Sequence, residues 1–336
     1  MSPAPHRIVK DVMAAVRAEA EQGRSFVRID VRNFFPSILH NRLDSELKRF
    51  HLDPLVRALC MNAVRTPTGA KVPSNGVGVP QGLSISGALA AIYMATFDVT
   101  QKSRHSGYYR YVDDILVICQ TVEAAKVLDQ VTRSLNSRGL KAHKLNVAGK
   151  TEIAPLSDGI DYLGYRLCYG KVSIRKSSYN RMYKNLLKVI TDFRYRKNFK
   201  RTLFRLNLKI TGCIVDEKRR GWMMFFSQTE DMSQLKRLDI FVQNQLKRVG
   251  FPEDQLPIIA RFVKSCYEIR FNLEQTKYIP DFNSFTQAEK IDVIAALSDH
   301  SPAELQTWEI EAIENEFSRL ISREVHDLET DVGAVS

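Results

Sequence analysis

Long apolar runs, paired cysteines and an apolar leader are all missing from this sequence. No apolar run approaches the roughly 20 residues of a membrane-spanning helix, and the first residues lack the apolar core of a signal peptide. The five cysteines stand singly, without a Cys-x-x-Cys pair, so we expect reduced, buried thiols rather than a zinc site or a disulfide framework. These absences argue against the membrane-spanning and secreted classes and predict a cytoplasmic protein.

Acidic residues are scarce in one part of the chain and abundant in another. The formal net charge is +11, which is typical of proteins that contact nucleic acid. Residues 171–209 hold thirteen Lys or Arg against one acid, Asp192, which predicts a surface that follows phosphates. The candidate nucleic-acid contacts in this segment are Arg175, Lys176, Arg181, Lys184 and Lys188.

Residues 286–336 reverse this balance, with twelve Asp or Glu against three basic residues. Such a segment is unsuited to a nucleic-acid surface. We expect it to cover another subdomain or to pack on a second protomer.

Two adjacent carboxylates interrupt an otherwise apolar and aromatic stretch, residues 108–119. The β-branched and aromatic residues on either side predict a β-hairpin with Asp113 and Asp114 at its bend. Most Asp-Asp pairs are ordinary surface turns. Here, however, another acid, Asp30, ends a predicted strand of alternating pattern, and Pro36 follows it.

If the two strands lie side by side, three carboxylates come together. Acids so close would repel one another unless a cation lay between them. Carboxylate oxygens are the ligands that hard cations such as Mg²⁺ prefer. The pattern therefore indicates a site for divalent metal.

The remaining periodicity predicts a chain of mixed helices and strands. Helical spacing of apolar residues predicts helices over 6–22, 36–66 and 123–138, with Gly139 ending the last of them. Residues 140–153 are expected to form paired strands, and further helices follow residue 171.

Five short motifs occur in the order of motifs A to E of the reverse transcriptases. They are Asp30 with Phe34-Phe35, Gly78 to Ser86, Tyr111 to Asp114, Gly139-Leu140 with Lys150-Thr151, and Tyr162 to Tyr165. Residues 26–170 therefore resemble this family, and within it they are most similar to the bacterial reverse transcriptases. Residues 221–246 most resemble the defence-associated enzymes of that bacterial group. Gly87 departs from the family pattern, which usually has proline after the second serine of motif B.

The resemblance implies roles for particular residues. Asp30 and Asp113 would bind two Mg²⁺ ions, with the carbonyl of Val31 as a further ligand and Asp114 in a supporting role. Lys150 would act as a general acid or charge stabiliser at the leaving pyrophosphate. The expected nucleotide contacts are Val31, Phe34, the steric gate Phe35, Gln81, Gly82 and Ser84. The expected primer grip is Tyr162, Leu163 and Gly164.

The expected fold is α+β: a polymerase palm, with an antiparallel sheet backed by helices, followed by an α-helical thumb and C-terminal region. The expected segments are a remnant of the fingers at 1–23, the palm at 24–170, a basic helical thumb at 171–285 and an acidic helical region at 286–336. Only 29 residues precede Asp30, too few for the usual fingers. Either the chain is a fragment, its start is placed too late, or the fingers come from a partner or a second protomer.

The resemblance implies an RNA-directed DNA polymerase that adds dNTPs to a 3′ hydroxyl. Its partners would be an RNA template or a bound noncoding RNA and the DNA product, and a role in anti-phage defence is implied by the resemblance alone. Two alternatives stay open at this point. One is a template-independent or protein-primed nucleotidyl transferase, and the other is a nucleic-acid-binding palm subunit that needs a partner for activity.

Overall fold

The computed structural model describes residues 5–18, 23–66, 76–80, 83–145, 147 and 149–332. The chain divides into two compact units, one made of Met1–Leu163 with Leu167–Gly170 and the other of Gly164–Arg166 with Lys171–Val335. Antiparallel strands and helices make up the first unit and helices dominate the second, which confirms the α+β class. The finer division into four segments stays a prediction. Among the described helices, none combines the length and apolar character that crossing a membrane requires.

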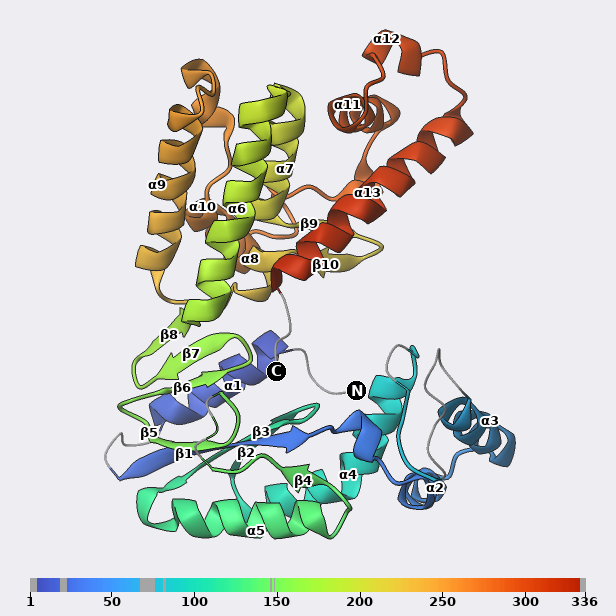
Figure 1. Cartoon of the computed structure of the whole chain (residues 1–336), viewed down its shortest axis with the longest axis vertical. Helices are drawn as coiled ribbons and strands as arrows, with labels where there is room; N and C mark the ends of the chain where they lie inside the picture. Colours follow the sequence, from blue (N-terminus) through green and yellow to red (C-terminus); the bar gives the residue numbers. More distant parts are fainter. Residues whose placement is uncertain are drawn as a thin grey trace. The chain divides into compact units, whose positions relative to one another are not determined.

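An antiparallel sheet organises the first unit (Figure 1). Its strand order is β2-β3-β1-β4, and β5 also pairs with β1. The strands are β1 (Arg24–Arg32), β2 (Gly107–Tyr111), β3 (Asp114–Gln120), β4 (Lys141–Ala142) and β5 (Glu152–Pro155). The paired strands expected over residues 140–153 are observed as β4 and β5, and both pair with β1, at Val31–Arg32 and at Ser25–Arg28. Strand β1 is therefore central.

Alternation along β1 sends its side chains to opposite faces of the sheet. Val27, Ile29 and Val31 belong to a large apolar core that also contains residues of α4 (Ser86–Arg104) and α5 (Ala124–Asn136). The intervening residues, which include Arg28 and Asp30, face the other way. Figure 1 shows α1 (Pro5–Ala18) on the side of the sheet opposite α5. The apolar face of β1 thus anchors the strand while its other face carries charge.

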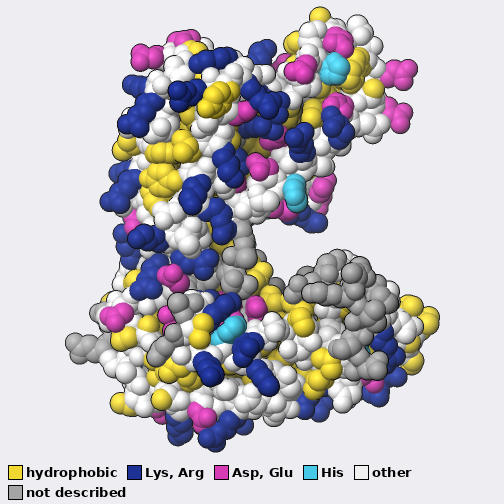
Figure 2. Space-filling view, viewed as in Figure 1, with side chains coloured by type: hydrophobic (Ala, Val, Ile, Leu, Met, Phe, Trp, Pro, Cys, Tyr) yellow, Lys and Arg dark blue, Asp and Glu magenta, His cyan; other side chains and the backbone are white. Residues whose placement is uncertain are grey.

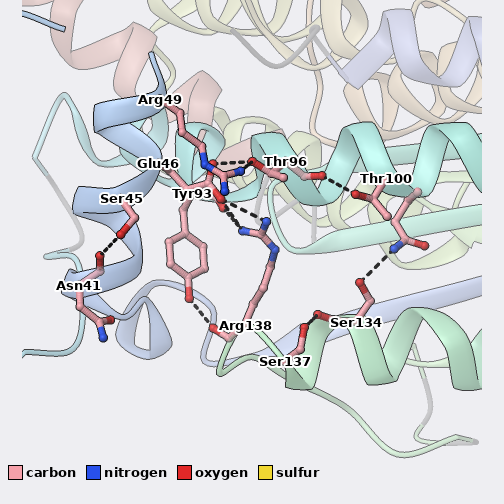
Figure 3. Close-up of polar contacts among 11 residues, drawn as sticks. Asn41, Ser45, Glu46, Arg49, Tyr93, Thr96, Thr100, Ser134, Ser137 and Arg138 are labelled. Carbon is pink, nitrogen blue, oxygen red and sulfur yellow. Dashed lines mark hydrogen bonds and ion pairs between the residues drawn. The ribbon is translucent and has the colours of Figure 1, made fainter. Parts of the chain in front are cut away.

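A buried polar network ties the helices of the first unit together (Figure 3). Glu46 of α2 (His40–Arg49) accepts hydrogen bonds from both terminal nitrogens of Arg138, each at 3.2 Å, and from the Thr96 hydroxyl. Arg138 also donates to the Tyr93 carbonyl at 2.7 Å, and the Tyr93 hydroxyl donates back to the Arg138 carbonyl. Buried charges are tolerated when they are paired in this way. The network therefore connects α2, α4 and the turn that follows α5. Helix α3 (Pro54–Arg65) follows α2 in the chain.

The chain passes between the units at strands β6 (Ile160–Tyr162), β7 (Tyr165–Cys168) and β8 (Lys171–Ile174). The second unit then contains a short β-ribbon, β9 (Cys213–Val215) with β10 (Lys218–Arg220). Its helices are α6 (Lys176–Arg196), α7 (Phe199–Thr211), α8 (Trp222–Phe225), α9 (Met232–Arg248), α10 (Phe262–Phe271), α11 (Gln287–Leu297), α12 (Pro302–Leu305) and α13 (Ile310–Val332).

The acidic C-terminal helix α13 packs within this second unit and neutralises basic side chains of α7. Lys209 is buried and its ammonium lies 2.8 Å from a carboxylate oxygen of Asp327 and 2.8 Å from one of Asp331. Arg205 donates from Nε to the Glu324 carboxylate at 3.0 Å. The acidic segment therefore packs on α7 of the same unit, and its expected role in covering a separate subdomain stays a prediction.

Candidate active site

Strands β1 and β3 bring the predicted carboxylates to one end of the sheet. In their antiparallel register Asp30 lies directly opposite Asp114, and the Val31 amide donates to the Asp113 carbonyl at 3.1 Å. Val112 and Asp113 form the two-residue turn between β2 and β3, and Val112 has a φ of 51°. A β-branched residue in the left-handed region is strained, and such strain is held in place only where the surrounding structure fixes it. The hairpin predicted from the sequence is confirmed.

Asp114 is held by a cation that the sequence analysis missed, Arg28. Both side chains are fully buried, and the guanidinium donates to both carboxylate oxygens, from Nε at 2.9 Å and from Nη2 at 2.7 Å. Burial raises the pKa of the Asp114 carboxyl to about 6, although Arg28 opposes this shift. Since side chains two residues apart on a strand share a face, the position of Arg28 relative to Asp30 was the sequence feature that could have revealed it.

Asp30 also has two basic neighbours. The Lys150 ammonium lies 3.1 Å from Oδ2 of Asp30, and Nε2 of His143 lies 3.2 Å from Oδ1. The Asp30 amide donates to the Thr151 hydroxyl at 3.4 Å, and the Asp30 carbonyl accepts from the His143 amide at 2.9 Å. The structure thus places the predicted Lys150 at the predicted acid. His143 was not predicted, because no local pattern distinguishes it.

The third acid, Asp113, is only partly buried. Burial raises the pKa of its carboxyl, and the negative charge of Asp30 raises it further. Like charges on directly opposed strand residues destabilise a sheet, so this end of the sheet is unfavourable unless cations compensate. Arg28 and Lys150 supply part of that compensation within the protein.

Carboxylate oxygens of this kind suit a hard divalent cation such as Mg²⁺, which two of them would bind as ligands. Within the described part of the chain, no group of three His, Cys, Asp or Glu side chains is arranged to hold a metal ion. This agrees with the contacts of Asp114, whose two oxygens are both bound by Arg28. Asp30 contacts Lys150 and His143, both partly exposed, and Asp113 is only partly buried, so these two carboxylates are the candidate metal ligands. Mg²⁺ is commonly bound by one or two carboxylates together with phosphate oxygens of the substrate, so two are enough.

Comparison with known proteins agrees with this geometry. The family model described as reverse transcriptase (RNA-dependent DNA polymerase) matches residues 2–167. The chain carries a reverse transcriptase domain. No sequence among the curated proteins matches the chain.

Solved structures of low identity also resemble the chain. An apo telomerase from Candida tropicalis, truncated from its C-terminal domain, has a TM-score of 0.41 and 15% identity and covers 52% of this chain and 41% of its own. A Candida albicans telomerase in complex with a fragment of telomeric RNA has a TM-score of 0.42 and 14% identity, with 97% and 52% covered. A foamy viral protease-reverse transcriptase in complex with an RNA/DNA hybrid has a TM-score of 0.36 and 16% identity, with 71% and 28% covered. The chain therefore spans about half or less of each of these proteins.

The predicted nucleotide contacts of the reverse transcriptase domain lie at different depths. The side chains of Val31 and Phe34 are buried in the apolar core, whereas Phe35 is half-buried against that core and meets Phe34 edge to face. Ser84 is exposed just before α4. The predicted contacts Gln81 and Gly82 lie outside the described residues. Phe35 and Ser84 are thus the two described members of this set whose side chains reach the surface.

The predicted primer grip has buried side chains. Tyr162 and Leu163 are both fully buried, and the Tyr162 hydroxyl donates to the Asp114 carbonyl at 3.3 Å. Leu163 and Gly164 have positive φ values of 48° and 82°, as in a tight turn. A primer contact from this turn stays a prediction, and it would have to come from the backbone rather than from these two side chains.

Beyond the reverse transcriptase domain, the predicted nucleic-acid contacts lie on or beside α6. Lys176, Lys184 and Lys188 are exposed and recur at multiples of four residues, which places them along one face of the helix. Arg181 is half-buried instead and donates to the Val332 carbonyl at 3.1 Å. Arg175 precedes the helix as its N-cap residue. Figure 2 shows that Lys and Arg side chains outnumber acidic ones over the part of the second unit that contains α6 and α9.

Proposed function

We propose that this protein is an RNA-directed DNA polymerase that adds dNTPs to a 3′ hydroxyl by metal-assisted phosphoryl transfer. The observation that carries the proposal is the register of β1 and β3, which brings Asp30 beside the Asp113–Asp114 turn inside a reverse transcriptase domain. An RNA template is favoured by the description of the matching family. A role in anti-phage defence stays a prediction from the sequence resemblance.

Two Mg²⁺ ions would be held by the carboxylates of Asp30 and Asp113, with the Val31 carbonyl as a further candidate ligand. When bound, such ions lower the pKa of the attacking hydroxyl and neutralise the triphosphate and the leaving pyrophosphate. Lys150 is held beside this site by its ion pair with Asp30. Its ammonium would carry a proton or a positive charge toward the leaving group.

Arg28 and Tyr162 would keep the catalytic turn in place. The guanidinium of Arg28 fixes the Asp114 side chain, and the Tyr162 hydroxyl binds the Asp114 carbonyl. Because Asp113 is the neighbour of Asp114, these contacts limit the movement of the Asp113 carboxylate. Catalysis by positioned ligands loses much of its rate when the geometry loosens by as little as about 1 Å.

The test is extension of a labelled DNA primer on an RNA template by the purified full-length chain, with Mg²⁺ and dNTPs. Asp113→Asn is expected to abolish extension, whereas Asp129→Asn, which changes an exposed acid of α5 paired with Arg133, is the matched control and is expected to retain it. Extension by Asp113→Asn at the wild-type level would refute the metal assignment.

Further arms of the same assay separate the alternatives. Products whose sequence ignores the template, or that are covalently attached to the protein, would favour untemplated or protein-primed transfer. Tight binding of the primer–template without any product would favour a binding subunit that requires a partner.

The steric gate is tested by sugar discrimination. Phe35 is half-buried against the core, so its ring is held in place. Phe35→Ala is expected to raise incorporation of ribonucleotides relative to deoxyribonucleotides, and Phe50→Ala, an exposed phenylalanine at the end of α2, is the control. Unchanged discrimination in Phe35→Ala would remove the assignment.

A further inference from the structure

A pair of exposed aromatic side chains on α10 stands apart from everything assigned above. Tyr267 is 59% exposed and Phe271 is 71% exposed, and their ring centroids lie 5.2 Å apart on the same face of the helix. Aromatic side chains bury large areas when they have a protein partner, so two of them left this open on neighbouring turns are unusual for a protein surface that contacts only water.

Phe271 also lines a cavity of about 370 Å³, all of it within the second unit. The other residues around it are Arg219, Ile269, Arg270, Asn272, Leu273, Glu274 and Gln275. The cavity is bounded by the last turn of α10, by the turn that follows it and by β10. It combines an aromatic ring, cationic groups and side-chain amides, which is the donor set that binds a nucleobase and its phosphates.

Two arginines leave positive charge at this cavity. Arg270 donates from Nε to the Ser227 carbonyl and from Nη2 to the Thr229 carbonyl, the latter at 2.7 Å, so it is fixed by neutral groups. Within the part of the chain that the structure describes, no carboxylate forms an ion pair with Arg219 or Arg270. Among the described residues that line the cavity, Glu274 is the one acid, and Glu268 accepts a hydrogen bond from the lining residue Asn272 at 2.8 Å. Residues 171–285 as a whole hold 24 Lys or Arg against 11 Asp or Glu.

We propose that this surface binds single-stranded nucleic acid, with a base stacked on Phe271 and neighbouring phosphates at Arg219 and Arg270. Charge decides against an apolar protein segment as the occupant, because such a segment would leave both guanidinium groups uncompensated. Tyr267 offers a stacking surface for an adjacent base. Gln275 is exposed beside the cavity, where its amide can meet a base edge. All residues of the site belong to the second unit, and binding there is proposed independently of the polymerase activity.

The test is fluorescence anisotropy of a short, unstructured, labelled RNA titrated with the full-length chain, without metal or dNTPs. Phe271→Ala is expected to weaken binding about tenfold, in line with the loss of one stacked base. Phe271→Trp is expected to retain binding and Phe271→Leu to lose it, because only an aromatic face can stack. Ile310→Ala is the matched control, since Ile310 is 70% exposed at the start of the acidic helix α13.

Salt dependence separates stacking from charge. Arg219→Gln is expected to reduce the slope of log affinity against log salt by about 0.7, the value for one phosphate of a single strand, whereas Phe271→Ala should leave the slope unchanged. Competition by unlabelled single-stranded DNA, a duplex and a mononucleotide identifies the form that is bound, and displacement by the mononucleotide alone would overturn the assignment to a strand.

Wild-type RNA affinity in both Phe271→Ala and Phe271→Leu would overturn the proposal. If those variants instead shift the sedimentation of the protein from dimer to monomer, the surface is an interface between copies of this chain. Because the assay contains no dNTPs, loss of binding here is distinguishable from loss of polymerase activity.

Discussion

Removing Arg28 should show how strongly the stability of the catalytic turn depends on one buried ion pair. Arg28→Met deletes two charged hydrogen bonds, at 2.9 and 2.7 Å, and leaves the Asp114 carboxylate in the core without a counter-ion. Hydrogen bonds to charged groups contribute about 1.5–3 kcal/mol each. Breaking a fully buried pair by removing one partner costs about 3–5 kcal/mol in the free energy of unfolding. Both estimates give the same magnitude for this variant.

The double variant makes the argument specific to the pair. Asp114→Leu alone leaves the buried guanidinium without its hydrogen-bonded carboxylate, with Glu152 at 4.0 Å as a more distant counter-ion, and is expected to cost about 3–5 kcal/mol or somewhat less. The double variant Arg28→Met with Asp114→Leu replaces both charges with apolar groups and is expected to cost far less than the sum of the single changes.

The assay should follow the first unit alone. Hydrogen exchange of peptides from β1 and β3 reports the local stability of the sheet. The two tryptophans, Trp222 and Trp308, both belong to the second unit, so their fluorescence during urea unfolding serves as the internal reference. The reasoning is refuted if Arg28→Met lowers protection of β1 and β3 by less than about 1 kcal/mol, or if the two single losses simply add.

Substitutions at three further positions test local features of the fold. Gly87 is helical and exposed, and a Cβ there would meet no atom within 4 Å, so Gly87→Ala should stabilise the protein by about 0.4–1 kcal/mol in urea unfolding followed by circular dichroism. Gly139→Ala should do the reverse by more than about 1 kcal/mol, since its φ is 78° and the new Cβ would lie 2.7 Å from the Leu39 side chain; a neutral result would contradict the left-handed turn. Asp231 caps α9 and pairs with Lys171 at 2.9 Å, so Asp231→Ala should cost about 1 kcal/mol by tryptophan fluorescence and Asp231→Asn, which keeps the cap, should cost less. Burial alone would raise the pKa of Asp231, but hydrogen bonds from Lys171 and Ser233 lower it, so the charged carboxylate stabilises the fold at pH values above the unfolded-state pKa. The difference in unfolding free energy between wild type and Asp231→Asn should therefore disappear as the pH falls through the folded-state pKa. A difference that stays constant in acid would contradict this.

Local patterns were sufficient for the elements that carry the predicted acids. The alternation in residues 26–31 and the aromatic flanks of the Asp113–Asp114 turn predict two strands, and an acid at the end of each strand places both at one edge of a sheet. Glycine at position 139 predicted the end of α5, and its φ of 78° agrees with that role. These features depend on neighbours in sequence, which is why composition and spacing reveal them.

Contacts between residues far apart in the sequence could not be predicted from such local patterns. The pairing of Arg28 with Asp114 depends on the register of β1 against β3, and the approach of His143 to Asp30 depends on β4 pairing with β1. The burial of Tyr162 likewise follows from packing against the catalytic turn, where its hydroxyl donates to the Asp114 carbonyl. The docking of α13 on Lys209 and Arg205 joins residues more than a hundred positions apart.

Metal binding is the property on which the proposed activity depends. Titration of the full-length chain with Mn²⁺, followed by electron paramagnetic resonance of the free ion in the presence of primer–template and a non-hydrolysable dNTP, measures it directly. The wild type is expected to bind two ions, Asp30→Asn and Asp113→Asn are expected to lose them, and Asp129→Asn is expected to keep them. Two ions bound with unchanged affinity by Asp30→Asn would contradict the assignment of the active site.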